Sequence, residues 1–508
     1  MAARFRRDPE VDESAGVVLV AIGAGVVLVA EGIDVEEAGW IDELGDSEVA
    51  AEEAASSLDG SFAADEDEDF KALEETLERP VAGIVMSGSE VGNGDPKKGS
   101  NSHATNITTS ITPSITSSIT HSMNPSTSLP TSTPTSQIDS SNLPDGDPEL
   151  LKSAGRYIKS ILDPDDTSLP RLECPRIDSQ RYGYLNPNLK YQKRKFFFAL
   201  NIRQKVDLLP RLMGSIAEAI RFLGPENCAL SIVEGNSGDG TYEVLKTLQS
   251  HMENIGIEFH FQHSDLDPGA GERIPRLAEL RNLALAPLLD RGKHYSSDAT
   301  VLFLNDVAIC AEDILELAHQ RRRLGADMTC AMDWTYVGND PTFYDVWISR
   351  TIAGDSFFEI PPDGNWNSAW NIFWNEATTQ RLFRDHRPFQ VFSCWNGAVA
   401  ISAQPLLDRI IRFRAPGPGE CFQGEPSLFC KDMWNNGFGK IAVVPSINLE
   451  YSDEAGRKIK TAKGFTNQWI KPDEDEKSLD WRKEPPEKVK CMPSYEKQAW
   501  EPWNQGLE

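Results

Sequence analysis

Basic residues are scarce in this sequence. Its 508 residues include 50 lysines and arginines against 78 aspartates and glutamates, which gives a formal net charge of −28. Roughly nineteen acidic residues against one lysine lie in residues 31–78, so about two thirds of this charge belongs to one segment. Nucleic-acid binding needs a basic surface, and the composition therefore argues against a nucleic-acid partner.

The paired cysteine spacing of zinc ribbons and thioredoxin-like sites is also missing. None of the eight cysteines is separated from another by two residues, which argues against both classes of site. An even number of cysteines is compatible with disulfides in a secretory compartment. Their spacing does not determine which cysteines pair, and several can equally be free thiols in the core.

A long hydrophobic run is lacking as well, because a comfortable membrane span needs about twenty apolar residues. The one candidate is residues 15–30 (AGVVLVAIGAGVVLVA), which follow Arg4, Arg6 and Arg7. Basic residues before an apolar run are typical of a signal-anchor whose basic end stays in the cytosol. We therefore expect residues 1–30 to be a membrane anchor, with a signal-peptide core or a pair of Val/Gly-rich strands as the alternatives.

Composition divides the rest of the chain into three parts. Residues 31–150 are first acidic and then, in residues 101–142, dominated by Ser, Thr and Pro, so we expect a disordered stem. Residues 151–474 carry regular apolar patterns and form the expected globular domain. Residues 475–508 are polar, and we expect an extended tail.

Within the expected domain, short apolar runs alternate with stretches that have apolar residues at helical spacing. This alternation is typical of an α/β domain with a mostly parallel sheet flanked by helices. The expected strands are residues 195–202, 229–234, 257–262, 301–304, 328–332, 399–401 and 440–444. The expected helices begin near residues 210 and 241 or comprise residues 275–289, 311–324 and 425–434.

Residues 301–307 (VLFLNDV) are the most informative segment. Four apolar residues predict a buried strand that ends at Asn305 and Asp306. Ligands of open α/β sheets bind at the carboxyl ends of strands, and a carboxylate there is well placed to hold a divalent cation against a phosphate. The alternative is that Asp306 caps the next helix.

A glycine-containing turn, residues 234–241 (EGNSGDGT), lies between a predicted strand and a predicted helix. Its glycines let backbone amides approach a ligand, and the amino end of a helix favours anions. Glu234, Asn236 and Asp239 are therefore candidate ligand-binding residues. The turn matches neither GxGxxG nor a P-loop, and a helix cap with a turn is the alternative.

Three later motifs add candidate residues. Arg281, followed by Asn282, is a cation that can neutralise a diphosphate or can lie on a solvated helix face. Residues 392–397 (FSCWNG) are a polar turn whose glycine allows close approach of a substrate. Glu425 begins a helix after a glycine, where a carboxylate is favoured by the helix dipole alone or serves catalysis or acceptor binding.

The order of these parts resembles the GT-A nucleotide-sugar fold. The segments VEGNSGDGT, LRNLAL, VLFLNDV, FSCWNGA, GECFQGEPS and KIAVVPSINLEY further resemble the fungal capsule-associated α-1,3-mannosyltransferases, glycosyltransferase family 69. The resemblance covers residues 195–451. It implies a GT-A-like enzyme of the Golgi membrane, single-pass type II with a lumenal catalytic domain, that transfers mannose from GDP-mannose to a mannose-containing glycan with retention of the α configuration.

The resemblance also implies roles for individual residues. Glu234, Asn236, Asp239 and Arg281 are expected to bind the nucleotide sugar. Such a transfer forms a glycosyl cation-like centre and a diphosphate leaving group, so a cation near the diphosphate is chemically reasonable.

Asp306 and Glu425 are the catalytic residues that the resemblance implies, Asp306 at a Mn²⁺ or Mg²⁺ ion and Glu425 near the acceptor. Many GT-A enzymes present Asp-x-Asp to the metal, but this chain has Asn305, Asp306 and Val307 in the corresponding place. A single carboxylate holds a cation weakly and leaves phosphates and water to complete its coordination. Metal dependence is therefore an open expectation.

Two other functions remain compatible with these motifs. The first is a GT-A enzyme that uses a different nucleotide sugar. The second is a non-catalytic lumenal factor that binds glycans or assists their assembly with the same fold. A sugar-chain hydrolase fits less well, because no pair of carboxylates with an acid/base context is evident.

Overall fold

The fold was analysed in a computed structural model, in which residues 17–22, 25–30, 143–186, 193–470 and 478–507 are described. The helices are α3 (Pro148–Leu162), α4 (Ser179–Tyr182), α5 (Leu209–Leu223), α6 (Thr241–Asn254), α7 (Arg273–Asp290), α8 (Ala311–Arg323), α9 (Ala377–Arg384), α10 (Gln404–Leu407), α11 (Glu425–Asn435), α12 (Asp453–Lys463) and α13 (Thr466–Trp469).

The strands of the domain are β3 (Arg194–Ile202), β4 (Cys228–Glu234), β5 (Glu258–His263), β6 (Tyr295–Leu304), β7 (Met328–Val337), β8 (Asp340–Phe343), β9 (Arg350–Thr351), β10 (Phe389–Ser393), β11 (Ala398–Ser402) and β12 (Ile441–Leu449). They form a ten-stranded sheet in the order β5-β4-β3-β6-β11-β7-β12-β10-β9, with β8 paired to β7. Only β8, β10 and β11 run against the common direction of this sheet. The predicted α/β class and mostly parallel sheet are confirmed.

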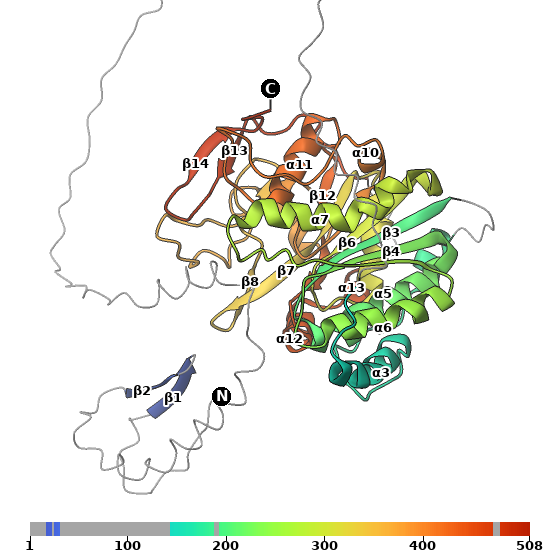
Figure 1. The fold of residues 1–508 in the computed structure, drawn as a ribbon. Helices are drawn as coiled ribbons and strands as arrows, with labels where there is room; N and C mark the ends of the chain where they lie inside the picture. Colours follow the sequence, from blue (N-terminus) through green and yellow to red (C-terminus); the bar gives the residue numbers. More distant parts are fainter. Residues whose placement is uncertain (1–16, 23–24, 31–142, 187–192, 471–477, 508) are drawn as a thin grey trace, which may run out of the picture.

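The sheet is covered by helices on both faces, and the side chains of β3 show why. Phe196, Phe198 and Leu200 belong to a core shared with α5, α6 and α8, whereas Phe197 and Ala199 belong to a core shared with α7, α10 and α11. Successive side chains of a strand point to opposite faces, so an uninterrupted apolar run is what a strand buried on both faces requires. Figure 1 shows α7, α10 and α11 on one side of the sheet and α5 and α6 on the other, with α3 against α5 and α6.

The domain begins earlier than residue 151. Its first helix, α3, starts at Pro148, and the Asp147 side chain caps it by accepting from the backbone amides of Glu149 and Leu150. The Tyr242 hydroxyl donates to the carbonyl of Pro144 at 2.6 Å. The last few residues assigned to the stem are thus part of the domain, and the stem up to residue 142 lies outside the described residues.

The predicted anchor is described only in part. Two strands, β1 (Val17–Ile22) and β2 (Gly25–Ala30), form an antiparallel pair, which corresponds to the strand-pair alternative for this segment. No helix within the described ranges is long and apolar enough to cross a membrane. Residues 1–16 and 23–24 lie outside the described residues, and the anchor stays a prediction.

The expected extended tail is corrected by the structure for residues 478–507. This segment forms the antiparallel pair β13 (Lys488–Cys491) and β14 (Ala499–Pro502). Its few apolar side chains are anchors, because Val489 and Met492 are buried in the domain core, and a disulfide joins Cys491 to Cys421. Because this segment is polar on average, its composition did not indicate that these few residues pack against the domain.

Six of the eight cysteines form disulfides. The pairs are Cys174–Cys310, Cys330–Cys394 and Cys421–Cys491, and the thiols of Cys228 and Cys430 are free and buried. Disulfides are expected from the even cysteine count, but their partners become evident only when the fold brings distant segments together.

Replacing Cys421 and Cys491 by serine is expected to lower the free energy of unfolding, because the disulfide closes a loop of 70 residues. For a loop of this size the loss is about 4 kcal/mol. Denaturant unfolding of both proteins under oxidising conditions measures it, with limited proteolysis to detect release of the carboxyl-terminal segment.

The matched control is Cys228→Ala, which removes a buried but unpaired thiol and should cost only about 1 kcal/mol. Equal unfolding midpoints for the double variant and the wild-type protein would contradict the proposed contribution of this disulfide.

Candidate active site at the carboxyl edge of the sheet

The carboxyl ends of the parallel strands meet at one edge of the sheet. In the strand register, Ile202 pairs with Glu234, Glu234 pairs with His263, and Leu304 lies at the corresponding end of β6. The antiparallel strand β11 starts at the same edge, because Ala398 pairs with Leu304. Motifs that lie far apart in the sequence therefore come together where ligands of α/β sheets bind.

Arg281 of α7 is the centre of this edge. Its Nε donates to Glu425 Oε1 at 2.7 Å, and its Nη1 lies 3.5 Å from Asn305 Oδ1. The guanidinium carbon is 4.5 Å from the ring centroid of Trp395, whose indole Nε1 donates to the same Asn305 oxygen at 3.0 Å. The Arg281 side chain is 12% exposed, so the solvated helix face is excluded as its environment.

Glu425 is buried at the start of α11. A Cβ at the preceding Gly424 would lie 2.3 Å from Ile348 Cδ1, so any larger residue there would require the end of the Ile348 side chain to move. The carboxylate thus lies in the first turn of a helix, where the dipole favours negative charge, and also pairs with Arg281. Two predicted residues, Arg281 and Glu425, are therefore in direct contact. Nucleotide-sugar binding by Arg281 and catalysis by Glu425 stay predictions.

Asp306 lies at the same edge and is partly exposed. Its Oδ2 is 3.0 Å from the Nζ of Lys205, and the two side chains are 30% and 32% exposed. An ion pair this exposed contributes little to stability, so both groups are accessible to a charged ligand. Lys205 was absent from the predicted site, although its position shortly after the carboxyl end of β3 follows the same rule that pointed to Asp306.

The donor atoms around Asp306 fit a metal ion only in part. No group of three or more His, Cys, Asp or Glu side chains in the described part of the chain is arranged to hold a metal ion. The side-chain oxygen of Asn305 already accepts hydrogen bonds from Trp395 and Arg281. A lone carboxylate suits an ion that is held jointly with substrate phosphates, and does not suit a closed protein cage.

The carboxylate of Glu234 binds the backbone of the glycine turn. It is fully buried and accepts from the backbone amides of Asn236 at 3.1 Å and Ser237 at 2.8 Å, and from His263 Nδ1 at 3.0 Å. Gly235 packs closely here, because a Cβ on it would lie 3.2 Å from the Cβ of Arg203. Glu234 therefore fixes the path of the turn, and His263 is a supporting residue that the motif did not reveal.

Asp239 also serves the turn itself. Its Oδ1 accepts from the amide of Thr241 at 2.9 Å and its Oδ2 accepts from the amide of Val206 at 3.0 Å. These contacts match the alternative of a helix cap with a turn. Asn236, exposed and with a positive φ of 60°, is the predicted residue of this turn whose side chain remains directed to the surface.

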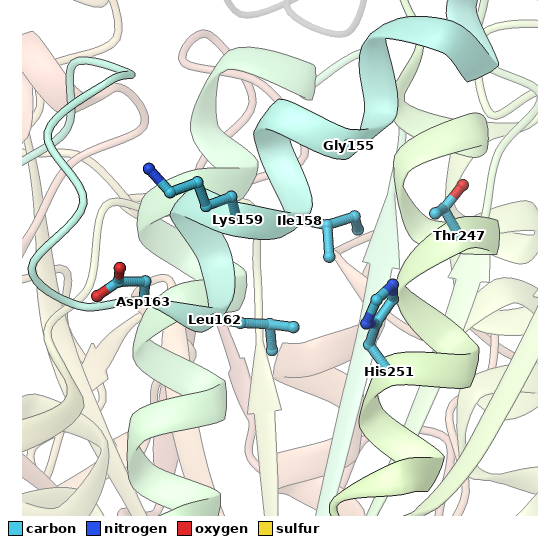
Figure 2. A pocket seen from close by; sticks show the side chains of 7 residues that line it. All are labelled: Gly155, Ile158, Lys159, Leu162, Asp163, Thr247 and His251. Atoms are coloured by element: carbon cyan, nitrogen blue, oxygen red, sulfur yellow. The ribbon is translucent and has the colours of Figure 1, made fainter.

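A separate cavity of about 410 Å³ lies between α3 and α6 (Figure 2). Its lining consists of Gly155, Ile158, Lys159, Leu162, Asp163, Thr247 and His251. None of the predicted site residues lines this cavity, so it is separate from the candidate active site.

Residues 195–432 match the family model described as Cryptococcal mannosyltransferase 1. The chain is also 35% identical over 364 residues to Alpha-1,3-mannosyltransferase CMT1 of Cryptococcus neoformans var. neoformans serotype D, a match that covers 68% of this chain and 75% of that protein.

Three solved structures show weak likeness. S. aureus TarS 1-349 matches with a TM-score of 0.30 and 16% identity, over 51% of this chain and 60% of that one. GalNAc-T7 with UDP, GalNAc and Mn²⁺ matches with a TM-score of 0.32 and 13% identity, over 51% of this chain and 43% of that one. The mannosyltransferase PcManGT from Pyrobaculum calidifontis with GDP-Man and Mn²⁺ matches with a TM-score of 0.30 and 10% identity, over 59% of this chain and 63% of that one. The chain spans less than two thirds of each, and the TM-scores are too low to support a statement on function.

The family-model match extends from the start of β3 into α11 and thus includes the glycine turn, Arg281, Asp306 and Glu425. Together with the extent of its identity to the Cryptococcus enzyme, this match shows that the chain belongs to the family of fungal capsule-associated mannosyltransferases.

Proposed function

We propose that this protein transfers mannose from GDP-mannose to a mannose-containing glycan, in α-1,3 linkage and with retention of the α configuration. Mannosyltransferase activity follows from the family, and the linkage from the name of the 35% identical relative. The observation that carries the proposal is the cluster at the carboxyl edge of the sheet, where Arg281, Asp306 and Glu425 lie on neighbouring segments.

The charges at this edge suit a nucleoside diphosphate leaving group. Arg281 has a planar guanidinium fixed by Glu425 and Trp395, and Lys205 is a partly exposed ammonium group beside Asp306. Fixed cations stabilise the charge that develops on the departing diphosphate without reorganisation during the reaction. The exposed Asn236, after β4 in the glycine turn, is well placed for the nucleotide part of the donor.

We further propose that Asp306 holds a divalent cation, Mn²⁺ or Mg²⁺, together with the diphosphate oxygens of the donor. When bound, such an ion neutralises the leaving group. Asp306 and Lys205 then present opposite charges to the same substrate group, so Lys205 orients phosphate oxygens while Asp306 attracts the ion.

For Glu425 we propose a place beside the sugar centre, where its carboxylate faces the positive charge that forms during transfer. Its Oε1 is held by Arg281, which fixes the orientation of the group. Burial limits water around it, and a buried carboxylate acts more strongly on a developing charge than one in water.

We also propose that the catalytic domain works in the Golgi lumen, attached to the membrane by residues 1–30. The three disulfides support a secretory compartment, because disulfides persist in oxidising surroundings. Protease protection of the full chain in sealed Golgi vesicles tests this placement, and digestion without detergent would contradict it.

The donor specificity is tested with a panel of GDP- and UDP-sugars, a mannoside acceptor and NMR assignment of the product. The expected product is an α-1,3-linked mannoside formed from GDP-mannose. A product formed only from a UDP-sugar would overturn the proposed donor and favour a GT-A enzyme with another substrate.

The Asp306→Asn variant is expected to lower kcat/KM for transfer by about 100-fold, since it removes the one carboxylate available to the ion. Chelation of divalent ions should lower wild-type transfer and change the residual activity of the variant much less.

Asp298→Asn is the matched control. Asp298 belongs to the same strand, β6, and also pairs with a lysine, Lys195 at 2.6 Å, but lies before the apolar run that leads to Leu304. Equal loss of transfer in both variants, or full activity of Asp306→Asn, would contradict a special role for Asp306.

A double substitution separates the structural and functional roles of Arg281 and Glu425. Arg281→Met alone leaves the Glu425 carboxylate buried without its partner and should cost about 3 kcal/mol of stability. Combining it with Glu425→Leu replaces the ion pair by apolar groups, which should restore stability without restoring transfer.

Denaturant unfolding and initial rates of transfer are measured on the single and double variants. A stable double variant that still transfers mannose would show that the ion pair only supports the fold.

A further inference from the structure

Two carboxyl groups lie directly behind the turn that carries Trp395. Asp333 lies in the buried part of β7 and is 0% exposed, and Asp345 lies in the loop after β8. Gly397 connects this place with the site: a Cβ on it would lie 3.5 Å from the Cβ of Asp333 and 3.1 Å from Val307, the residue after Asp306.

Asp333 is buried without a cationic partner. The hydroxyl of Tyr451 donates to its Oδ2 at 2.6 Å, whereas its Oδ1 is buried without a hydrogen-bond partner in the described structure. An ionised carboxylate rarely occupies such a place, because desolvation is offset only by hydrogen bonds or opposite charge on both oxygens. A protonated carboxyl group needs less compensation.

Asp345 is the more exposed member of the pair and holds the turn. Its Oδ2 accepts from the backbone amide of Asn396 at 2.9 Å. Asn396 has a positive φ of 55°, which is unusual outside glycine, and its side chain accepts from Ser349 at 2.6 Å and donates to the Ala331 carbonyl at 2.8 Å. This strained backbone directs Trp395 towards Asn305 and Arg281.

Among the described residues, the other titratable groups near Asp333 supply no compensating positive charge to it, whereas the buried guanidinium of Arg350 lies close enough to act on the charge of Asp345. The ring of Tyr344 packs on that of Tyr451 with centroids 5.1 Å apart, and Glu450 precedes Tyr451. The lysines of α12 lie on neighbouring rings instead: Lys458 Nζ is 3.6 Å from the Tyr336 centroid, and Lys463 Nζ is 4.2 Å from the Trp334 centroid.

Burial and then the negative charge of Asp345 raise the pKa of the Asp333 carboxyl group well above its ordinary value. Burial, followed by the charge of Asp333, likewise raises the pKa of the Tyr451 hydroxyl, so this group stays a hydrogen-bond donor. The direction for Asp333 agrees with its contacts, because one of its oxygens accepts from the Tyr451 hydroxyl and the other is buried without a hydrogen-bond partner among the described residues.

We propose that Asp333 and Asp345 share a single proton at neutral pH, carried by Asp333, and that this pair is a positioning device for the Trp395–Gly397 turn of the transfer site. The part that concerns transfer rests on the proposed function, whereas the protonation of Asp333 does not. Two like charges placed side by side in a buried site separate into one neutral and one ionised group. Because Asp333 is neutral, it does not repel the ionised carboxylate of Asp345, which accepts a hydrogen bond from the Asn396 amide.

Protonation is tested by unfolding the wild-type protein, Asp333→Asn and the control Asp340→Asn in denaturant at a series of pH values. The folded chain keeps a proton that the unfolded chain releases above about pH 4, so the contribution of Asp333 to stability falls as pH rises. Asparagine has no proton to release and should remove this fall, whereas the exposed Asp340 of β8 should not change it.

An Asp333→Asn protein with the same pH dependence of stability as the wild-type protein would overturn the proposed protonation. This experiment uses no substrate, so its outcome is independent of whether mannosyl transfer is the correct reaction.

Positioning is tested by the pH profiles of kcat and KM for transfer. Wild-type transfer should decline at alkaline pH as Asp333 ionises, and Asp333→Asn should move or abolish that decline. Asp345→Ala removes the acceptor for the Asn396 amide and should lower kcat/KM by about tenfold or more through misplacement of the turn.

Asp345→Asn keeps an oxygen for the Asn396 amide and should recover most of the transfer that Asp345→Ala loses. It also removes the like charge that raises the folded-state pKa of Asp333, so the fall of stability should still begin near pH 4 but should end at a lower pH than in the wild-type protein. If Asp345→Ala does not fold, the pH dependence of stability and of transfer in Asp345→Asn, compared with that of the wild-type protein, still tests the role of the Asp345 charge. An unchanged alkaline limb in Asp333→Asn, or full activity of Asp345→Ala, would overturn the positioning role.

Discussion

The buried ion pair between Arg281 and Glu425 connects the segments on which the candidate site depends. Arg281 comes from α7 and Glu425 from the start of α11, while Asn305 and Trp395 complete the surroundings of the guanidinium group. The two side chains are 12% and 3% exposed, so each would be costly without the other. Moving one of these segments therefore disturbs the others, which keeps the site geometry fixed before any substrate arrives.

The positive charge of Arg281 lies at the carboxyl edge of the sheet, where ligands of α/β sheets bind. The chain as a whole carries a formal net charge of −28, yet this edge holds two cations, Arg281 beside Glu425 and Lys205 beside Asp306. Guanidinium and ammonium groups are suitable donors for diphosphate oxygens, and the overall charge of the chain largely reflects residues 31–78. The pair of Asp333 and Asp345 extends the same principle, since the Asp345 carboxylate lies where the backbone amide of Asn396 donates a hydrogen bond to it.

Much of the fold was predictable, because the strands at residues 195–202 and 301–304 are apolar runs and the helices have regular apolar spacing. The rule that ligands bind at the carboxyl ends of parallel strands also led to Asp306. What the sequence did not reveal are contacts made by the antiparallel strand β11, which enters between β6 and β7 and brings Trp395 to Asn305. The Lys205–Asp306 pair, the disulfide partners and the attachment of the carboxyl-terminal segment likewise depend on tertiary structure, and local patterns carry no information on them.

The most direct test of the central claim is a crystal structure of the protein with GDP-mannose and Mn²⁺. We expect the diphosphate at the carboxyl edge of the sheet, within hydrogen-bond distance of Arg281 or Lys205, with the ion between Asp306 and the phosphates. Nucleotide bound elsewhere, for example in the cavity between α3 and α6, with Arg281 and Asp306 untouched, would contradict it.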